Sequence, residues 1–146
     1  MSAFPAARIY KIAQVAVWTQ LTSSGASEDV LWSGAPHDQA DGFIHLCTAE
    51  QLATVLSRFY KGSAPGSLLA VEIDTLAYAN WLTARDGRLV FEAPVHPGGA
   101  PNTASENARL YPHAYGPLPV NDSRIVLRSV SVVENADGSF TAGNII

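Results

Sequence analysis

The chain of 146 residues contains very little sulfur, with one cysteine, Cys47, and one methionine. A single cysteine excludes an internal disulfide bond, the crosslink that is typical of proteins from oxidising compartments. The N-terminus also lacks the basic stretch and the apolar core that form a secretory signal. Together these absences predict a cytoplasmic protein.

Long apolar segments are missing as well, because the longest apolar runs have only the length of a strand. A membrane-spanning helix needs about 20 apolar residues, so we expect no membrane insertion. Charged residues make up 15% of the chain and give a formal net charge of −4 with a pI near 5.4. Domains that bind nucleic acid usually present a basic face, and we therefore expect no nucleic-acid partner.

What the chain does contain fits one globular domain. Hydrophobic residues make up 47% of the sequence, and a domain of this length buries about 70% of the surface that its unfolded chain exposes. The sequence shows no internal repeat and no linker that would divide it. We therefore expect residues 1–146 to form a single domain.

Hydrophobic periodicity predicts the strands. Alternating or continuous apolar runs indicate strands at residues 8–13, 67–73, 87–92 and 124–133. Near the C-terminus, Asp137 and Gly138 predict a hairpin turn into a further strand. Residues 111–120 are aromatic but contain three prolines, which restricts this stretch to an edge strand or an ordered extended loop.

Helical spacing predicts the helices and leaves two connections. One helix is expected at residues 14–24 with a stop at Gly25, a second follows Thr48, and residues 74–82 are expected to form a short helix or turn. Residues 27–41 have the composition of a connection. Residues 93–109 lack apolar periodicity, and loops of that length are often functional lids or disordered. Helices that come early and strands that come late favour an α+β fold.

The segment from Asp41 to Gln51 is the strongest candidate for a site. Side chains alternate along a strand, so Phe43, His45 and Cys47 are expected on one face. Thr48 and Gln51 fit a capping box at the start of the following helix. A polar ring at the end of a strand beside a helix N-terminus is suited to holding an anion or a nucleotide.

His45 has three interpretations from the sequence alone. It is a structural histidine bonded to backbone or a hydroxyl, a ligand-binding histidine that contacts a ribose or phosphate, or a metal ligand together with Cys47 and His113. A nucleophilic Cys47 activated by either histidine is a fourth use of the same residues. A reactive thiol needs partial exposure and an electropositive setting, whereas a small buried cysteine needs neither.

The stretch from Tyr111 to Pro117 is the second dense cluster. Its prolines and glycine restrict the backbone, so His113 and Tyr115 are expected at reproducible positions. They line a rigid pocket wall with an aromatic face for a flat ring, or they belong to an aromatic edge that ends a sheet.

Other polar residues are weaker candidates. Gln51 and Arg58 lie on one side of the same predicted helix, where Arg58 is available to a phosphate, to solvent or to Glu92. Glu92 ends a strand and is the best placed carboxylate for a general base, with a surface salt bridge as the alternative. Tyr10 and Lys11 point to opposite faces of the first strand, so at most one of them enters a given pocket. Turn capping accounts for His37, Asp38 and Asp41.

Taken together, these residues resemble a bacterial family of unknown function, the domain of unknown function numbered 952. The matching stretches follow one another in order along nearly the whole chain, at residues 9–12, 41–48, 51, 58–60, 91–92 and 111–119.

The resemblance implies a relation to the ADP-ribosyltransferase superfamily, whose compact α+β domain holds NAD in a cleft between two small, split sheets. In that superfamily a first-strand histidine or arginine bonds the ribose, a second-strand segment frames the nicotinamide, and a later glutamate orients the ribose. Here Tyr10 and Lys11 would take the first position and residues 43–48 the second, while residues 111–116 would lie near the expected glutamate.

This sequence departs from that pattern at two positions. The first strand offers lysine or tyrosine, and residues 111–116 contain no glutamate, since Glu92 comes from a different predicted strand. Ribosyl transfer passes through an oxocarbenium-like state whose electrostatic support is a large part of catalysis. The missing glutamate removes an obvious source of that support.

The sequence therefore predicts an ADP-ribosylation-like α+β fold with small, split antiparallel or mixed sheets and two or three helices. We expect its pocket to bind NAD or a related nucleotide without a metal, and to transfer or remove an ADP-ribosyl or phosphate group if it is catalytic. The catalytic candidates are His45, His113 and Glu92. The ligand-binding candidates are Tyr10, Lys11, Thr48, Gln51, Arg58 and Tyr115. The alternatives are a non-catalytic binding module that kept the fold, and a hydrolase that uses a metal or Cys47.

Overall fold

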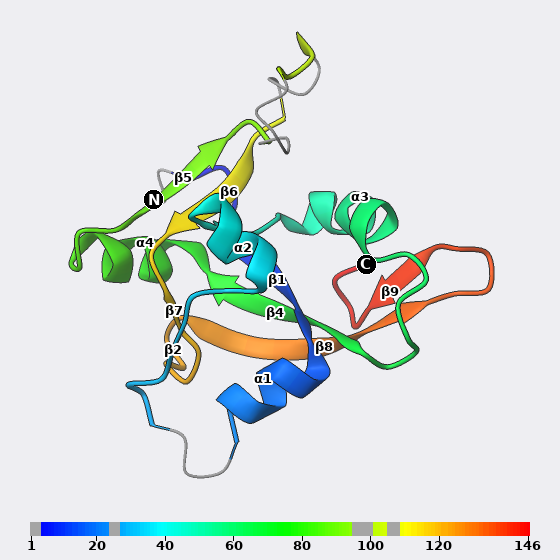
Figure 1. Ribbon diagram of the computed structural model, residues 1–146, viewed down its shortest axis with the longest axis horizontal. Helices are drawn as coiled ribbons and strands as arrows, with labels where there is room; N and C mark the ends of the chain where they lie inside the picture. The colour runs from blue at the N-terminus through cyan, green and yellow to red at the C-terminus, as the bar shows by residue number, and fades with distance from the viewer. Residues whose placement is uncertain (1–3, 24–26, 95–100, 105–108) are drawn as a thin grey trace.

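A computed structural model describes residues 4–23, 27–94, 101–104 and 109–146 (Figure 1). In these residues the strands form three antiparallel sheets. The largest has the order β1-β4-β8-β9, with β1 (Arg8–Gln14), β4 (Leu68–Asp74), β8 (Val126–Glu134) and β9 (Phe140–Ala142). The three-stranded sheet has the order β3-β6-β5, with β3 (Ile44–His45), β6 (Tyr111–Tyr115) and β5 (Arg88–Glu92). The third sheet pairs β2 (Leu31–Trp32) with β7 (Leu118–Pro119).

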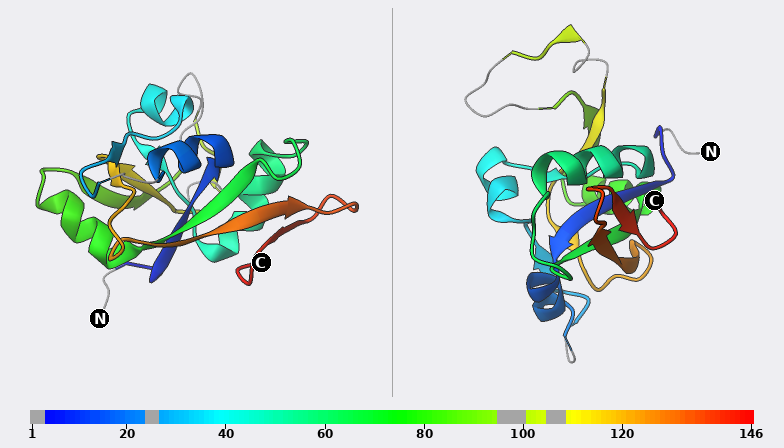
Figure 2. Two further views of the ribbon diagram at one scale, coloured as in Figure 1. Left: turned by 90° about the horizontal axis from the view of Figure 1, so that it is seen from below. Right: turned by 90° about the vertical axis from the view of Figure 1, so that its right-hand side faces the viewer.

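The described residues contain four helices, which connect and cover the sheets. They are α1 (Val15–Leu21), α2 (Pro36–Asp41), α3 (Ala49–Phe59) and α4 (Thr75–Thr83). The longest of them, α3, has 11 residues, and among these helices none is long and apolar enough to cross a membrane. Figure 2 shows that the β8–β9 hairpin extends from one end of the four-stranded sheet.

The four-stranded sheet separates two hydrophobic cores because both of its faces are apolar. On β1, Ile9 and Ala13 pack into one core, whereas Tyr10 and Ile12 pack into the other. This is the alternation that the sequence of β1 predicts. Lys11 lies on the same face of β1 as Ile9, so a lysine enters the larger core and is only 1% exposed.

The two larger sheets meet at a single bridge. The backbone N–H of Tyr10 donates to the carbonyl of Cys47 at 2.7 Å, and the N–H of Cys47 donates back at 3.0 Å. The chain leaves the three-stranded sheet after His45 and joins β1 two residues later. The sheets therefore divide at this point, with Lys11 of β1 and His45 of β3 close to the division.

The strand β6 corrects one prediction. Residues 111–115 form the central strand of their sheet, and not an edge strand or an extended loop. Pro112 is tolerated because its carbonyl accepts from the N–H of Leu46, and the two backbone groups of one residue point to the same neighbour in an antiparallel strand. The missing N–H therefore faces β3, whose ladder ends at His45, and no bond to β5 is lost.

Most other predicted elements are confirmed. The strands at 8–13, 67–73, 87–92 and 124–133 appear as β1, β4, β5 and β8, and the hairpin turn follows β8 with Gly138 at φ 85°. The predicted helices appear as α1, α3 and α4. The predicted connection at residues 27–41 is wrong, since it holds β2 and α2, which makes four helices where two or three were expected. Gly25 and most of residues 93–109 lie outside the described residues.

The apolar face of α3 holds this helix on the sheet, and it generates a prediction. Leu56 is fully buried in the second core, whereas Phe59 on the same helix is 73% exposed. We expect Leu56→Ala to lower the free energy of unfolding by about 2–5 kcal/mol, because it removes buried methyl groups and leaves a cavity. Urea denaturation measures this loss. Phe59→Ala is the matched control, and an equal loss in both variants would contradict the assigned burial.

Candidate functional site

The three-stranded sheet carries polar side chains on one face and core residues on the other. Ile44, Leu89 and Ala114 point into the larger core. The opposite face is called the histidine face here, and its residues come from all three strands and from the residue before β3. They are Phe43, His45, Arg88, Glu92, His113 and Tyr115. The register explains their proximity, because His45 pairs with His113 and Arg88 pairs with Tyr115.

The first polar pair joins α2 to β3. Pro36 starts α2 and Gly42, with φ at 85°, ends it, which brings the acidic side chains of this helix back over the strand. Asp38 Oδ1 lies 2.6 Å from Nδ1 of His45 and also accepts from the backbone N–H of His45 at 2.9 Å. On the other side of the ring, Asp41 Oδ2 lies 2.9 Å from Nε2. The imidazole of His45 is thereby fixed at both nitrogens.

Asp38 also holds Lys11 of β1. Its Oδ2 lies 2.8 Å from Nζ of Lys11 and accepts from the N–H of Ala35 at 2.7 Å. Asp38 is 1% exposed, and burial alone would raise its pKa. The hydrogen bonds from His45 and the charge of Lys11 outweigh burial and hold the pKa of Asp38 far below its usual range. Burial lowers the pKa of Lys11, and Asp38 opposes that shift.

The second polar pair joins β5 to β6. Glu92 Oε2 lies 2.7 Å from Nδ1 of His113 and 2.5 Å from the hydroxyl of Tyr115, which donates to it. Burial alone would raise the pKa of Glu92, but the hydrogen bonds from Tyr115 and His113 lower it. Burial lowers the pKa of His113 against the opposing effect of Glu92. The ring of Phe43 stacks on His113 with centroids 4.1 Å apart.

The two pairs lie next to each other but differ in exposure. The rings of His45 and His113 meet edge to face, with centroids 5.8 Å apart. The side chains of His45 and Glu92 are 31% and 32% exposed, whereas that of His113 is 3% exposed. A ligand on this face would therefore meet His45 and Glu92, and His113 would hold Glu92 in place from behind.

The structure brings only part of the predicted site together. His45, His113, Glu92 and Tyr115 share the histidine face, and Lys11 reaches it through Asp38. Tyr10 lies on the opposite face of β1, where its hydroxyl donates to Glu72 at 2.9 Å. This placement follows from strand alternation.

The remaining predicted ligand residues are Thr48, the N-cap of α3, and Gln51 and Arg58 of that helix. The buried residues of α3 pack in the second core, which contains no residue of the histidine face. The N–H of Thr48 donates to Oε1 of Gln51 at 3.0 Å, and Nε2 of Gln51 donates to the carbonyl of Leu110 at 2.8 Å. The side chain of Gln51 thereby fixes the start of the helix. Arg58 is exposed in its last turn.

The cysteine is inert in this fold. Cys47 is 2% exposed within the second core, and burial raises the pKa of its thiol to about 12. A nucleophilic thiol needs access and a stabilised thiolate, so the cysteine-dependent alternative loses its support.

A metal at the first pair is also poorly supported. Nitrogen and oxygen atoms of His37, Asp38 and His45 lie within 4.8 Å of one another. The carboxylate of Asp38, however, already has close polar contacts with Ala35, Lys11 and, twice, His45, which occupy its lone pairs. Nε2 of His37 lies further off, 3.5 Å from Oδ1. Lys11 also places a positive charge beside this carboxylate.

Asp38, Asp41 and Arg88 are residues of the site that sequence reasoning missed. Asp38 was explained as a turn residue, although Pro36 before it and Gly42 after it follow the pattern of a short helix that starts with proline and ends with glycine. For Arg88 the signal was its spacing, since it lies four residues before Glu92 and so shares a strand face with it.

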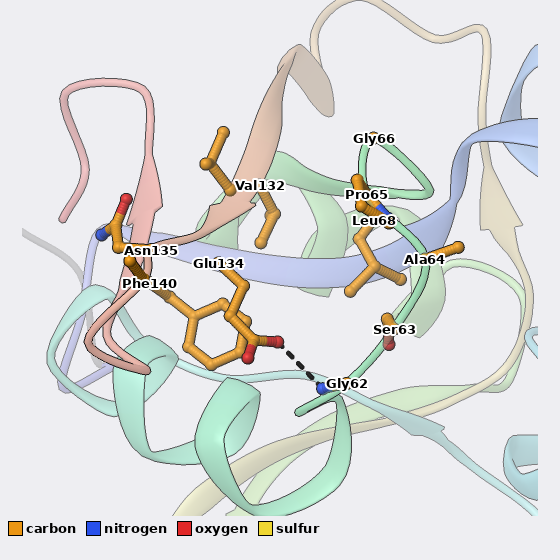
Figure 3. Close-up of a pocket in the computed structure, with 12 residues that line it drawn as sticks. Gly62, Ser63, Ala64, Pro65, Gly66, Leu68, Val132, Glu134, Asn135 and Phe140 are labelled. Atoms are coloured by element: carbon orange, nitrogen blue, oxygen red, sulfur yellow. Dashed lines mark hydrogen bonds between the residues drawn. The ribbon is translucent and has the colours of Figure 1, made fainter.

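One hollow of the surface is lined by none of the residues of the histidine face. It measures about 310 Å³ and is lined by the loop from Gly62 to Gly66 and by β8 and β9 residues (Figure 3). Its one charged lining residue among those described, Glu134, accepts from the N–H of Gly62 at 2.9 Å. Because this carboxylate is used by the loop, the hollow offers no group of titratable side chains comparable to the histidine face.

The fold is α+β with split antiparallel sheets. The histidine face is a polar site on the three-stranded sheet. The chain belongs to the family described as "Protein of unknown function (DUF952)", which matches residues 12–126. This confirms the family predicted from the sequence. The relation to the ADP-ribosyltransferase superfamily stays a prediction.

Solved structures agree with this assignment. A crystal structure of protein CC0527 from Caulobacter crescentus is 28% identical to this chain, with a TM-score of 0.63, and the match covers 92% of this chain and 93% of that one. A crystal structure of a double mutant of CC0527 has 26% identity and a TM-score of 0.61 over the same shares. No curated protein matches the chain.

The buried pair of Lys11 and Asp38 generates a stability prediction. We expect Lys11→Met to lower the free energy of unfolding by about 3–5 kcal/mol, because it leaves a buried carboxylate without its counter-charge. The double variant Lys11→Met with Asp38→Asn should recover part of that loss. Chemical denaturation measures both. Arg124→Met, at an ion pair whose arginine side chain is 82% exposed, is the control and should change stability little.

The pH dependence of stability follows from the second pair. The unfolded chain protonates histidine near pH 6.5, before the buried His113 does, so stability should fall as the pH drops below about 6.5. Glu92 has a lowered pKa, so its contribution is present above about pH 4.5 and is lost below it. Denaturation at several pH values measures both slopes. His113→Asn should flatten the first slope, and an unchanged slope would contradict the assignment.

Glu92→Gln provides the opposite test of the same pair. Without the carboxylate, burial of His113 is no longer opposed, so the pKa of His113 should fall further. The loss of stability that begins near pH 6.5 should therefore extend to lower pH in this variant, while the separate loss below about pH 4.5 becomes smaller.

Proposed function

We propose that the histidine face binds NAD or a related nucleotide that contains ADP-ribose, in a domain with an ADP-ribosylation-like fold. The observation that carries this proposal is the carboxylate of Glu92, held by two donors next to the half-exposed His45 where two small sheets divide.

Glu92 supports the proposal because it supplies the acidic group that residues 111–116 lack. Its strand, β5, pairs with β6, and its carboxylate contacts His113 and Tyr115 of that stretch. Both contacts use Oε2, which leaves Oε1 free of hydrogen bonds to the described residues. An ionised carboxylate with one free oxygen is suited to accept from the hydroxyls of a ribose.

The first strand contributes in a different way from the one that the resemblance implies. Lys11 is buried, so it does not contact a ligand directly. It binds Asp38, which in turn orients His45. The half-exposed His45 then takes the place of the first-strand histidine or arginine. Its Nε2 would contact the ribose or a phosphate in place of the carboxylate of Asp41, the more exposed of its two partners.

The same arrangement would serve an NAD-dependent transfer of an ADP-ribosyl or phosphate group. The negative charge of Glu92 would support the positive charge that develops on the ribose when the bond to nicotinamide breaks. Binding without release of nicotinamide would instead identify the chain as a binding module that kept the fold.

Thermal unfolding with NAD, NADP, ADP-ribose and AMP tests the proposal. A ligand that binds only the folded state stabilises it by about 2.7 kcal/mol at 100 times its Kd, so the midpoint of unfolding should rise with ligand concentration. Glu92→Gln should weaken binding about tenfold or more, since it removes a charge-assisted hydrogen bond. His45→Ala should weaken binding as well.

Arg58→Ala is the matched control for these variants. Arg58 is exposed in the last turn of α3, a helix whose buried residues pack in the second core, so its loss should leave nucleotide affinity unchanged. If none of the nucleotides shifts the midpoint, or if the folded Glu92→Gln and His45→Ala variants bind as the native chain does, the proposed site is wrong.

A further inference from the structure

Arg88 occupies the end of the histidine face that the proposed contacts leave unused. It is exposed at the start of β5, directly opposite Tyr115 of β6. Its guanidinium carbon lies 4.3 Å from the centroid of the Tyr115 ring, which is the geometry of a cation held over an aromatic face. Stacking of this kind restricts the plane of the guanidinium.

Arg88 forms no ion pair with a carboxylate of the described residues, although its charge contributes to the lowered pKa of Glu92. Three other arginines, Arg8, Arg124 and Arg128, form ion pairs with acidic side chains. Among the described residues, Arg88 has no carboxylate within the 4.0 Å that defines such a pair. The planar fork of an arginine matches a phosphate through two parallel hydrogen bonds, and here Tyr115 orients that fork.

One tyrosine side chain connects this cation to the proposed ribose contact. The ring of Tyr115 lies under Arg88, and its hydroxyl donates to Glu92 at 2.5 Å. The face therefore presents a cation over the ring of Tyr115 and a hydroxyl acceptor at the hydroxyl of the same side chain. A sugar that carries a phosphate has the complementary arrangement of hydroxyl groups and negative charge.

We infer that Arg88 binds the phosphate of the nucleotide, while Glu92 accepts a hydrogen bond from a hydroxyl of the same sugar phosphate. This inference rests on the proposed function. Arg88 is then the residue that selects phosphorylated ligands, and Tyr115 positions it and Glu92 together. The ligand class becomes a nucleoside phosphate, and nucleosides without a phosphate are discriminated against.

AMP and adenosine test this inference, because they differ only in the phosphate. For the native chain, isothermal titration should show AMP binding at least about tenfold more tightly than adenosine. Arg88→Ala should reduce the affinity for AMP to near that for adenosine and leave the affinity for adenosine unchanged. Arg88→Lys keeps the charge but loses the fork, so its affinity for AMP should lie between the two.

Arg85→Ala is the matched control. Arg85 is also an exposed arginine stacked on an aromatic ring, with its guanidinium carbon 4.1 Å from the centroid of Trp81. It lies beyond the end of α4, outside the histidine face, and donates to the carbonyl of Trp81. This variant removes the same charge from the chain, and it should bind AMP as the native chain does.

The outcomes separate this inference from the proposed function. Native binding of ADP-ribose or AMP with unchanged affinity in Arg88→Ala would overturn the role of Arg88 and leave the nucleotide site intact. An equal effect of Arg85→Ala would show that only net charge matters. Inorganic phosphate that competes as strongly as AMP would overturn the sugar hydroxyl contact. A native chain that binds none of these nucleotides would overturn both proposals.

Discussion

The buried carboxylate of Asp38 is the constraint on which the rest of the site depends. A charge removed from water is tolerated only where its partners are complete, and the partners of Asp38 come from three separate segments, β1, the start of α2 and β3. Lys11, His45 and the turn of α2 must therefore occupy one arrangement together. The position of His45 on the exposed face of the three-stranded sheet is a consequence of this buried network.

Local sequence patterns predict those elements whose stability is decided locally. The alternation in β1 assigns Tyr10 and Lys11 to opposite faces, and the two hydrophobic cores confirm that assignment. The apolar spacing of α3 and the reach of Gln51 back to Thr48 are likewise visible in the sequence. In these cases the position of each side chain depends only on neighbours within one helical turn or one strand, so the sequence pattern predicts it.

The sequence could not predict what depends on pairing between distant segments. Pro112 suggested an edge strand because a proline cannot donate a hydrogen bond to a neighbouring strand. That argument does not consider how long the neighbouring strand is. Pro112 lies in a central strand since β3 is too short to need the missing N–H. The network of Asp38 was hidden for a related reason. Nothing within α2 indicates that Lys11, 27 positions earlier, will bring a charge into the core beside it.

In each polar pair of the histidine face, the buried side chain fixes the position of the more exposed one. His113 and His45 are both candidates in the sequence, and in the structure each has a carboxylate partner. In the structure, however, the buried histidine supports an exposed carboxylate, whereas the exposed histidine is supported by a buried one. A histidine supported in this way gains orientation, and a carboxylate supported in this way keeps its charge. The face thus combines an oriented imidazole, an ionised Glu92 and the stacked cation of Arg88. Because each of the three is fixed by protein contacts before a ligand arrives, binding would order few side chains and lose little conformational entropy.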